Sequence, residues 1–441
     1  MKVLIKNGIL AGTGISEAEP VDILINGGHV QQIGPDIVDS EAGVIDARGR
    51  LVVPGLVDVH VHFREPGQEH KEDIRSGSRA AAAGGFTTVV AEPNTIPPID
   101  TPARVRSLLA TAREKSIVHF FTKATITHGL KGEELADIAG LKVAGARAIS
   151  DDGHPVQKDE LMQRALYEGR ECNIMVSPHC EESSLHWGKT HSEEHRNGQN
   201  TFWDRTGGCP GEKKYESEAR FIERDIAFAE SAHARIHISH VSLAKSVEII
   251  AAAKKRGVMV TAEATPHHFL LTTDDAERIG PNAKVNPPLR SKNDVEAIRE
   301  GLRNGTIDII ASDHAPHSPE EKNRPLDDAP FGVIGLETTL GLVLTYLVRP
   351  GILTLKQAID KMTITPARIF GLDAEGIGSL APGATGDVTI IDPDQEWKVD
   401  AREFYSKGRN CPFDGLVLQG KAVITMVEGR IVARDGKIVT D

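Results

Sequence analysis

The feature that most constrains the fold of this chain is an alternation through its middle part. Short apolar runs rich in β-branched residues alternate with longer segments of helical periodicity, such as "EDIRSGSRAAAA" and "LAKSVEIIAAAKKRG". Continuous apolar runs of this length are typical of strands buried on both faces of a parallel sheet. The runs that fit this description are residues 52–61, 86–91, 117–125, 146–150, 173–178, 235–240, 258–263 and 307–312.

Eight strands that alternate with crossover segments predict an α/β fold, a (β/α)8 TIM-like barrel over residues 52–374. A doubly wound open sheet is disfavoured because no G-x-G-x-x-G turn follows the first strand. Residues 1–51 and 375–441 are different, since they hold short strand-like runs separated by glycines. We expect these two terminal segments to pair as one small β-sandwich domain beside the barrel.

Composition narrows the range of partners. The net charge of −12 over 441 residues argues against a nucleic acid or an anionic membrane as partner. No window approaches the roughly 18 apolar residues that a membrane-spanning helix needs. The four cysteines show no C-x-x-C spacing, which predicts free thiols and a cytoplasmic location. They are Cys172, Cys180, Cys209 and Cys411.

Polar side chains gather at the carboxyl ends of the predicted barrel strands. His60, His62 and Arg64 occupy alternate positions, so they share one face where the first strand ends. Other strand ends carry Asp151, Asp152, His179, His240, Asp313, His314 and His317. In a (β/α)8 barrel all these ends converge on the rim where active sites lie.

A buried group of imidazoles and carboxylates would carry a large desolvation cost without a cation. Nitrogen and oxygen ligands without thiolate suit zinc, and also manganese or cobalt. Two metals that share a bridging carboxylate would use this many ligands. Either Asp151 or Asp152 could be the ligand from the fourth strand, with the other capping the turn that follows.

A series of longer motifs extends over almost the whole chain. They are "DVHVHFREPG", "GGFTTVVAEPNT", "SDDGHPV", "HCEE", "HISHVS", "TAEATPHH", "VNPPLR", "SDHAPH", "APFGVIGLET" and "FYSKGRNCPFDG". In this combination the chain resembles the dihydroorotases of the amidohydrolase superfamily, specifically the long bacterial type.

The resemblance implies one or two Zn2+ ions per subunit and a set of site residues. The implied metal ligands are His60, His62, Asp152, His179, His240 and Asp313. Asp152, rather than Asp151 or a modified lysine, would lie near both metals, and Asp313 would also be the catalytic proton shuttle. The implied substrate contacts are Arg64, Asn94, Asn286, His317, Phe331 and Gly332.

The reaction implied is the reversible cyclisation of N-carbamoyl-L-aspartate to (S)-dihydroorotate in pyrimidine (UMP) biosynthesis, with a hydroxide on the metal as the nucleophile of ring opening. The resemblance also implies a homodimer or a complex with aspartate transcarbamoylase. One rival is an allantoinase or hydantoinase-like cyclic amidase, whose substrates lack the ring carboxylate that Arg64 and Asn94 would bind. A second rival is an inactive dihydroorotase-like scaffold for aspartate transcarbamoylase, which would have lost metal ligands.

Two features leave alternatives open. Glu92 stands in "AEPNT" where "MPNT" is usual, and it faces either the site or the barrel wall. His191 and His195, in the long polar connection 181–214, form either an accessory metal site or part of a solvated loop. Residues 314–335 form a second long connection, which we expect to close over the substrate.

Overall fold

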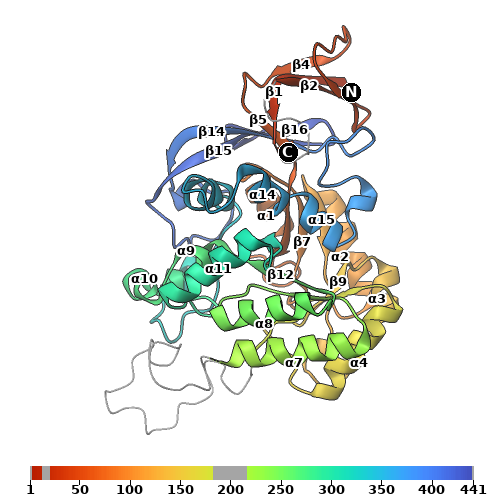
Figure 1. The fold of residues 1–441 in the computed structure, drawn as a ribbon, viewed down its shortest axis with the longest axis vertical. Coiled ribbons are helices and arrows are strands. Elements are labelled where there is room, and N and C mark those ends of the chain that lie inside the picture. The colour runs from red at the N-terminus through yellow and green to blue at the C-terminus, as the bar shows by residue number, and fades with distance from the viewer. Residues whose placement is uncertain (1, 12–19, 182–215, 440–441) are drawn as a thin grey trace.

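Parallel strands form a ring at the centre of the molecule, and helices lie around the outside of these strands (Figure 1). The computed structural model describes residues 2–11, 20–181 and 216–439. The strands of the ring are β6 (Leu56–Val61), β7 (Phe86–Ala91), β8 (His119–Thr122), β9 (Ala148–Ile149), β10 (Met175–Val176), β11 (Ile236–Ile238), β12 (Val260–Ala264) and β13 (Ile309–Ile310). Each lies within, or within one residue of, a run that the sequence predicted to be a strand.

Two short contacts close these strands into a barrel. The strands form one ladder in the order β6-β7-β8 and a second in the order β9-β10-β11-β12-β13. Parallel bridges between Ala124 and Ile149 and between Val61 and His314 join the two ladders at both seams. At the second seam the backbone N–H of His62 donates to the carbonyl of His314 at 2.8 Å. The predicted barrel is therefore confirmed, and its first and last strands are neighbours.

Helices lie between the barrel strands along the chain and pack around the outside of the barrel. They are α1 (Ile74–Ala83), α2 (Pro102–Lys115), α3 (Ile138–Ala144), α4 (Asp159–Glu171), α7 (Ser217–Ala232), α8 (Ala244–Lys255), α9 (Pro266–Leu270), α10 (Thr273–Ile279), α11 (Lys292–Asn304), α12 (Pro319–Lys322), α13 (Thr339–Val343), α14 (Leu355–Asp360) and α15 (Ile364–Ile369). α1 shows why they start where they do, because Asp73 and Ser76 form a reciprocal capping box there. In the described residues no helix is both long and apolar enough to cross a membrane.

Both ends of the chain contribute to one further sheet at the end of the molecule that carries both termini (Figure 1). Its strands are β1 (Lys2–Leu10), β2 (Val21–Asn26), β3 (His29–Gly34), β4 (Gly43–Asp46), β5 (Leu51–Pro54), β14 (Val388–Lys398), β15 (Val417–Val427), β16 (Arg430–Arg434) and β17 (Lys437–Ile438). β5 joins the two halves because it pairs with β1 on one side and with β14 on the other. The domain limits 1–51 with 375–441, and 52–374, stay a prediction.

One part of the C-terminal region leaves this sheet and contacts the barrel. Residues 399–416 connect β14 to β15. Within them, the hydroxyl of Ser406 donates to a carboxylate oxygen of Glu72 at 2.6 Å, and Nδ2 of Asn410 donates to the carbonyl of Ala315 at 3.0 Å. The terminal region is thus in contact with the segments that follow the first and the last barrel strands.

Candidate active site

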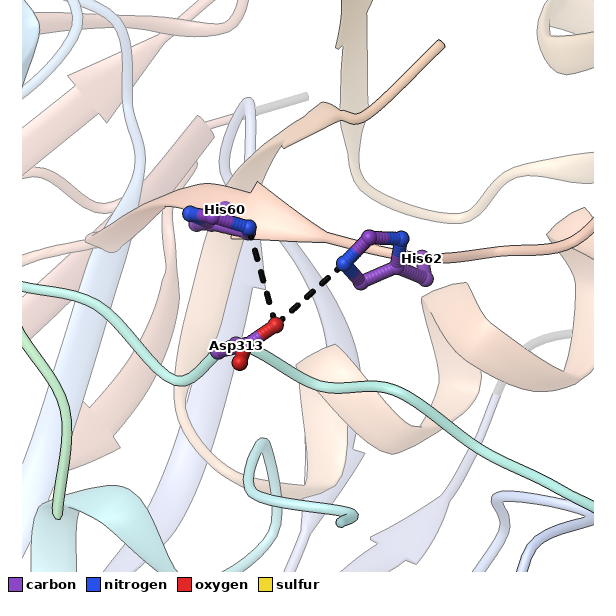
Figure 2. A group of neighbouring side chains, drawn as sticks. All are labelled: His60, His62 and Asp313. Atoms are coloured by element: carbon purple, nitrogen blue, oxygen red, sulfur yellow. Dashed lines mark ion pairs between the residues drawn. The ribbon is translucent and has the colours of Figure 1, made fainter. Parts of the chain in front are cut away.

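Barrel closure brings three predicted ligands together at the seam between β6 and β13. His60 and His62 come from the end of β6, and Asp313 follows β13 (Figure 2). Oδ1 of Asp313 lies 3.2 Å from Nε2 of His62 and 3.5 Å from Nε2 of His60. All three side chains are buried and point toward one another.

A second group lies beside the first and is joined to it by Asp152. Oδ1 of Asp152 lies 3.4 Å from Nε2 of His240, 3.5 Å from Nδ1 of His179 and 3.7 Å from Nε2 of His60. Its Oδ2 lies 3.6 Å from Nε2 of His62. The structure therefore brings together all six side chains that the sequence singled out. We call His60, His62, Asp152, His179, His240 and Asp313 the His/Asp cluster.

The donor atoms of this cluster fit a metal ion. Zinc binds imidazole nitrogen and carboxylate oxygen at about 2 Å, so donor atoms up to about 4 Å apart can share one ion. Nε2 of His60 is buried and has no hydrogen-bond partner among the described residues. Two overlapping groups, His60 with His62 and Asp313, and His60 with Asp152 and His240, could each hold a metal ion.

Electrostatics inside the cluster favour a cation. Burial acts to lower the pKa of His60, but the carboxylates of Glu92, Glu263 and Asp313 outweigh it and raise that pKa to about 10. Burial acts to raise the pKa of Asp313, but His60 and His62 hold it well below its usual range. The negative potential that retains a proton on His60 is the potential that would attract a metal ion.

Glu263, on β12, holds the imidazole of His60 from the side opposite the cluster. Its carboxylate accepts a hydrogen bond from Nδ1 of His60, and its other oxygen accepts one from Nε2 of His237 at 3.1 Å. Such carboxylate–histidine contacts fix the tautomer and orientation of a metal-binding imidazole. The sequence prediction missed this residue, although a carboxylate in the buried run "TAEA" was a usable signal.

Glu92 faces the site, which decides the alternative left open by the sequence. Its side chain is buried, and Oε1 lies 3.7 Å from Nε2 of His60. The same oxygen forms an ion pair with Nζ of Lys123, a side chain with no exposed surface. Lys123 also donates to Oγ of Ser177 at 3.3 Å. A buried ion pair thus adjoins the His/Asp cluster.

A pocket of about 290 Å³ opens beside the cluster. The predicted substrate contacts Arg64, Asn94, Asn286, Phe331 and Gly332 all line it. His317 is behind this lining, where its Nε2 lies 3.4 Å from a terminal guanidinium nitrogen of Arg64. The predicted metal ligands other than His60, and the predicted substrate contacts other than His317, therefore line a single cavity.

The pocket has one strongly cationic side. Desolvation lowers the pKa of Arg64 to about 10, so its guanidinium is still charged at neutral pH. Burial and the Arg64 charge lower the pKa of His317 far below its usual range. His317 is therefore neutral, and its Nε2–H donates to the carbonyl of Phe331 at 2.7 Å. Arg64 remains the charged group on this side.

The two asparagines also contact members of the cluster. Oδ1 of Asn94 accepts from Nδ1 of His62 at 2.9 Å, and its Nδ2 donates to Oδ2 of Asp152 at 3.1 Å. Nδ2 of Asn286 donates to Oε2 of Glu181 at 2.9 Å and lies 3.2 Å from Nε2 of His179. The roles of Asn94 in orienting ligands and of Glu181 in the lining were not predicted.

Other polar residues at the strand ends lie outside the cluster. Asp151 accepts from the backbone N–H groups of Ile126 and Thr127 at 2.7 and 3.1 Å, so it binds the segment that follows β8 rather than capping the turn after its own strand, while its neighbour Asp152 faces the predicted metal ligands. His314 points away, with Nε2 3.3 Å from Glu72.

Some sequence predictions fall outside the described residues. They concern His191, His195 and Cys209. The other three cysteines are free thiols. Residues 314–335 contain the short helix α12, and whether they close over the substrate stays a prediction.

The barrel and its rim of histidines and aspartates are typical of an amidohydrolase, and the comparisons with known proteins define the class as an amidohydrolase that acts on cyclic amides. A family model described as Dihydro-orotase-like matches residues 49–246, and one described as Amidohydrolase family matches residues 222–433. A solved structure of L-hydantoinase (dihydropyrimidinase) from Arthrobacter aurescens is similar with a TM-score of 0.89 at 32% identity, and the match covers 100% of this chain and 97% of that one.

Two curated relatives are more similar in sequence. Dihydroorotase from Pelotomaculum thermopropionicum is 47% identical over 435 residues, with 99% of each chain covered. Dihydroorotase from Bacillus licheniformis is 44% identical over 442 aligned positions, with 100% of each chain covered. The chain belongs to the dihydroorotase family, as its motifs predicted.

Proposed function

We propose that this chain catalyses the reversible cyclisation of N-carbamoyl-L-aspartate to (S)-dihydroorotate in de novo pyrimidine (UMP) biosynthesis. The observation that carries the proposal is the charged guanidinium of Arg64 in the pocket beside the His/Asp cluster. Dihydroorotate bears a carboxylate on its ring, and a guanidinium can bind a carboxylate through two parallel hydrogen bonds. Hydantoin and allantoin offer no such ring carboxylate.

The metal proposed is zinc, with one or two ions per subunit. His60 and His62 would bind one ion and His179 and His240 the other, with Asp152 between them and Asp313 as the last ligand. When bound, the metal would act as a Lewis acid, which polarises the ring amide carbonyl and makes a water molecule a better nucleophile. The donor set of imidazole nitrogen and carboxylate oxygen atoms is one that zinc accepts, as manganese and cobalt also do.

The side chains that line the pocket would bind and orient the substrate. Arg64, with Asn94 beside it, would bind the ring carboxylate, His317 would support the Arg64 guanidinium from behind the lining, and Asn286 would contact the polar atoms of the ring. Phe331 and Gly332 form the wall along which the ring would lie. These contacts would hold the scissile amide against the cluster.

Asp313 would move the proton. In ring opening its carboxylate takes a proton from the attacking water and delivers it to the ring nitrogen that leaves. In cyclisation the same carboxyl group moves a proton in the opposite direction. Asp313 both lines the pocket and lies against His60 and His62, so one group can serve both partners.

A substrate panel tests the proposal. The zinc-loaded protein should hydrolyse dihydroorotate, and form it from carbamoyl-aspartate, far faster than it hydrolyses hydantoin or allantoin. Arg64→Met should keep its zinc and raise the KM for dihydroorotate about 10- to 100-fold, the loss expected for a charge-assisted hydrogen bond. Arg303→Met, on the exposed face of α11, is the matched control.

Three outcomes would contradict the proposal. Faster turnover of hydantoin or allantoin would favour the cyclic amidase alternative. An unchanged KM in Arg64→Met would remove the carboxylate contact. Absence of both zinc and turnover would favour an inactive scaffold, although all six cluster positions are kept in this chain.

Assembly and location are further proposals. The resemblance to the long bacterial dihydroorotases supports a cytoplasmic homodimer or a complex with aspartate transcarbamoylase. Light scattering on the purified chain, alone and mixed with that transcarbamoylase, would distinguish a dimer from a mixed complex.

A further inference from the structure

The C-terminal motif "FYSKGRNCPFDG" contains Asn410, whose side chain contacts the rim of the barrel. Asn410 is 1% exposed, although it lies in the connection between β14 and β15. Its Nδ2 donates to the carbonyls of Ala315 and Gly332, each at 3.0 Å, and its Oδ1 accepts from the backbone N–H of His317 at 3.2 Å. A side-chain amide has two N–H donors and one carbonyl acceptor. Asn410 therefore uses both of its N–H donors and its carbonyl oxygen on the segments that form the pocket.

Two of the backbone groups that Asn410 binds lie on either side of the residue that holds Arg64. Ala315 and His317 flank Pro316, and the carbonyl of Pro316 accepts a hydrogen bond from Nε of Arg64 at 3.3 Å. Nε2 of His317 lies 3.4 Å from the same guanidinium. Asn410 thus holds the residue on each side of the carbonyl that orients Arg64.

The packing leaves the amide little freedom. A Cβ on Gly408 would lie 2.8 Å from Oδ1 of Asn410 and 2.8 Å from Cβ of Pro316. Gly332 has a φ of +131°, and a Cβ there would lie 2.7 Å from the carbonyl of Ala315. The two backbone segments and the C-terminal connection approach one another as closely as glycine allows.

We propose that Asn410 is a positioning residue for the ring carboxylate of the substrate, acting through Arg64, whose guanidinium lies against the Pro316–His317 segment that Asn410 holds. The inference rests on the proposed function, in which Arg64 binds that carboxylate. Among the described residues, Asn410 is not part of the pocket lining, so it has no direct contact to offer the substrate. Its effect comes from fixing the segments that carry Pro316, His317 and Gly332.

Two substitutions test this role in the full-length, zinc-loaded protein. Asn410→Asp keeps the shape but replaces both N–H donors by an oxygen that repels the carbonyls of Ala315 and Gly332. It should raise the KM for dihydroorotate about tenfold or more, while kcat changes less than about threefold and zinc content is unchanged. Asn410→Ser keeps one donor and should show the same split with a smaller rise; it provides the test if Asn410→Asp is not recovered folded.

A double variant distinguishes an effect of Asn410 on the position of Arg64 from a loss of activity caused by misfolding. Because Asn410 acts through Arg64, adding Asn410→Ser to Arg64→Met should change the KM less than about twofold relative to Arg64→Met alone. Tyr405→Phe is the matched control, since it removes a partly buried hydrogen bond of the same segment, to the backbone N–H of Ile438, away from the pocket.

The outcomes are distinguishable. An unchanged KM in an active Asn410 variant, a fall in kcat and zinc content without a rise in KM, or a KM effect that adds fully to that of Arg64→Met overturns the inference alone. Failure of the unaltered protein to turn over dihydroorotate overturns the proposed function and, with it, this inference.

Discussion

Glu263 and His60, which lie 203 residues apart in the chain, share a hydrogen bond inside the barrel, from Nδ1 of the imidazole to the carboxylate. The contact directs Nε2 of His60 toward Asp152 and Asp313. The other oxygen of Glu263 accepts from His237, so the carboxylate is itself fixed on two sides. Contacts within the protein therefore direct Nε2 of His60 at the other members of the cluster.

Substitution of Glu263 by Gln is expected to weaken zinc binding. The amide retains the size of the side chain but removes the charge that makes the His60 imidazole more basic and fixes its tautomer. Loss of such an outer contact costs about 10- to 100-fold in metal affinity. Competition with a chromophoric chelator measures this, with Glu296→Gln on the exposed face of α11 as control. Zinc affinity within about twofold of the unaltered protein would show that Glu263 does not orient the ligand.

Substitution of Lys123 by Met is expected to destabilise the fold through Glu92. The single change leaves a buried carboxylate without its partner, which costs about 3–5 kcal/mol. The double change Lys123→Met with Glu92→Met removes both charges and should recover most of that stability. Urea unfolding of the zinc-free proteins compares them without a contribution from metal binding. Equal destabilisation of the single and double variants would mean that packing, not the ion pair, is responsible.

The sequence predicted those features of the fold and site that depend on local pattern. Apolar runs identified the eight barrel strands, and polar residues at their ends identified the region of the site, while the resemblance to the dihydroorotases selected the six members of the cluster from among them. Glu263 and Lys123 were missed because their partners come from other strands and are set by barrel closure. Asn410 gave no local signal, since its partner Ala315 is 95 residues away. The strand order of the terminal sheet was likewise not readable, because it depends on β5 pairing with both ends of the chain.

Substitution of Asp313 by Asn is expected to abolish most turnover in both directions. Asp313 has a φ of +47°, a conformation that Asn also tolerates, so the backbone should be kept. The amide cannot take and return a proton, and loss of a general acid–base group costs roughly 10²- to 10⁴-fold in rate. Turnover per bound zinc is the measurement, since Asp313 is also a predicted ligand. A rate per zinc within about tenfold of normal would remove the shuttle role from Asp313.

An ion pair between His119 and Asp387 makes part of the contact between barrel and terminal sheet dependent on pH. Nε2 of His119, at the start of β8, lies 3.0 Å from Oδ2 of Asp387, which directly precedes β14. Burial acts to lower the pKa of His119, but Asp387, with Glu428 and Glu375, outweighs it and raises that pKa above 6.5. A raised pKa in the folded state means that the pair stabilises the protein fully below the ordinary histidine pKa, and that this stability is lost as pH rises through the raised value.

His119→Gln is therefore expected to lower the Tm more at about pH 6, where the imidazole is charged in the folded protein, than at about pH 9. The measurement is the difference in Tm between the unaltered and substituted proteins at each pH, with zinc held at one free concentration because metal binding also shifts Tm. Subtracting the two curves removes the pH dependence of every other group, including the cluster histidines. A difference in Tm that stays constant with pH would mean that His119 contributes packing and not charge to the junction.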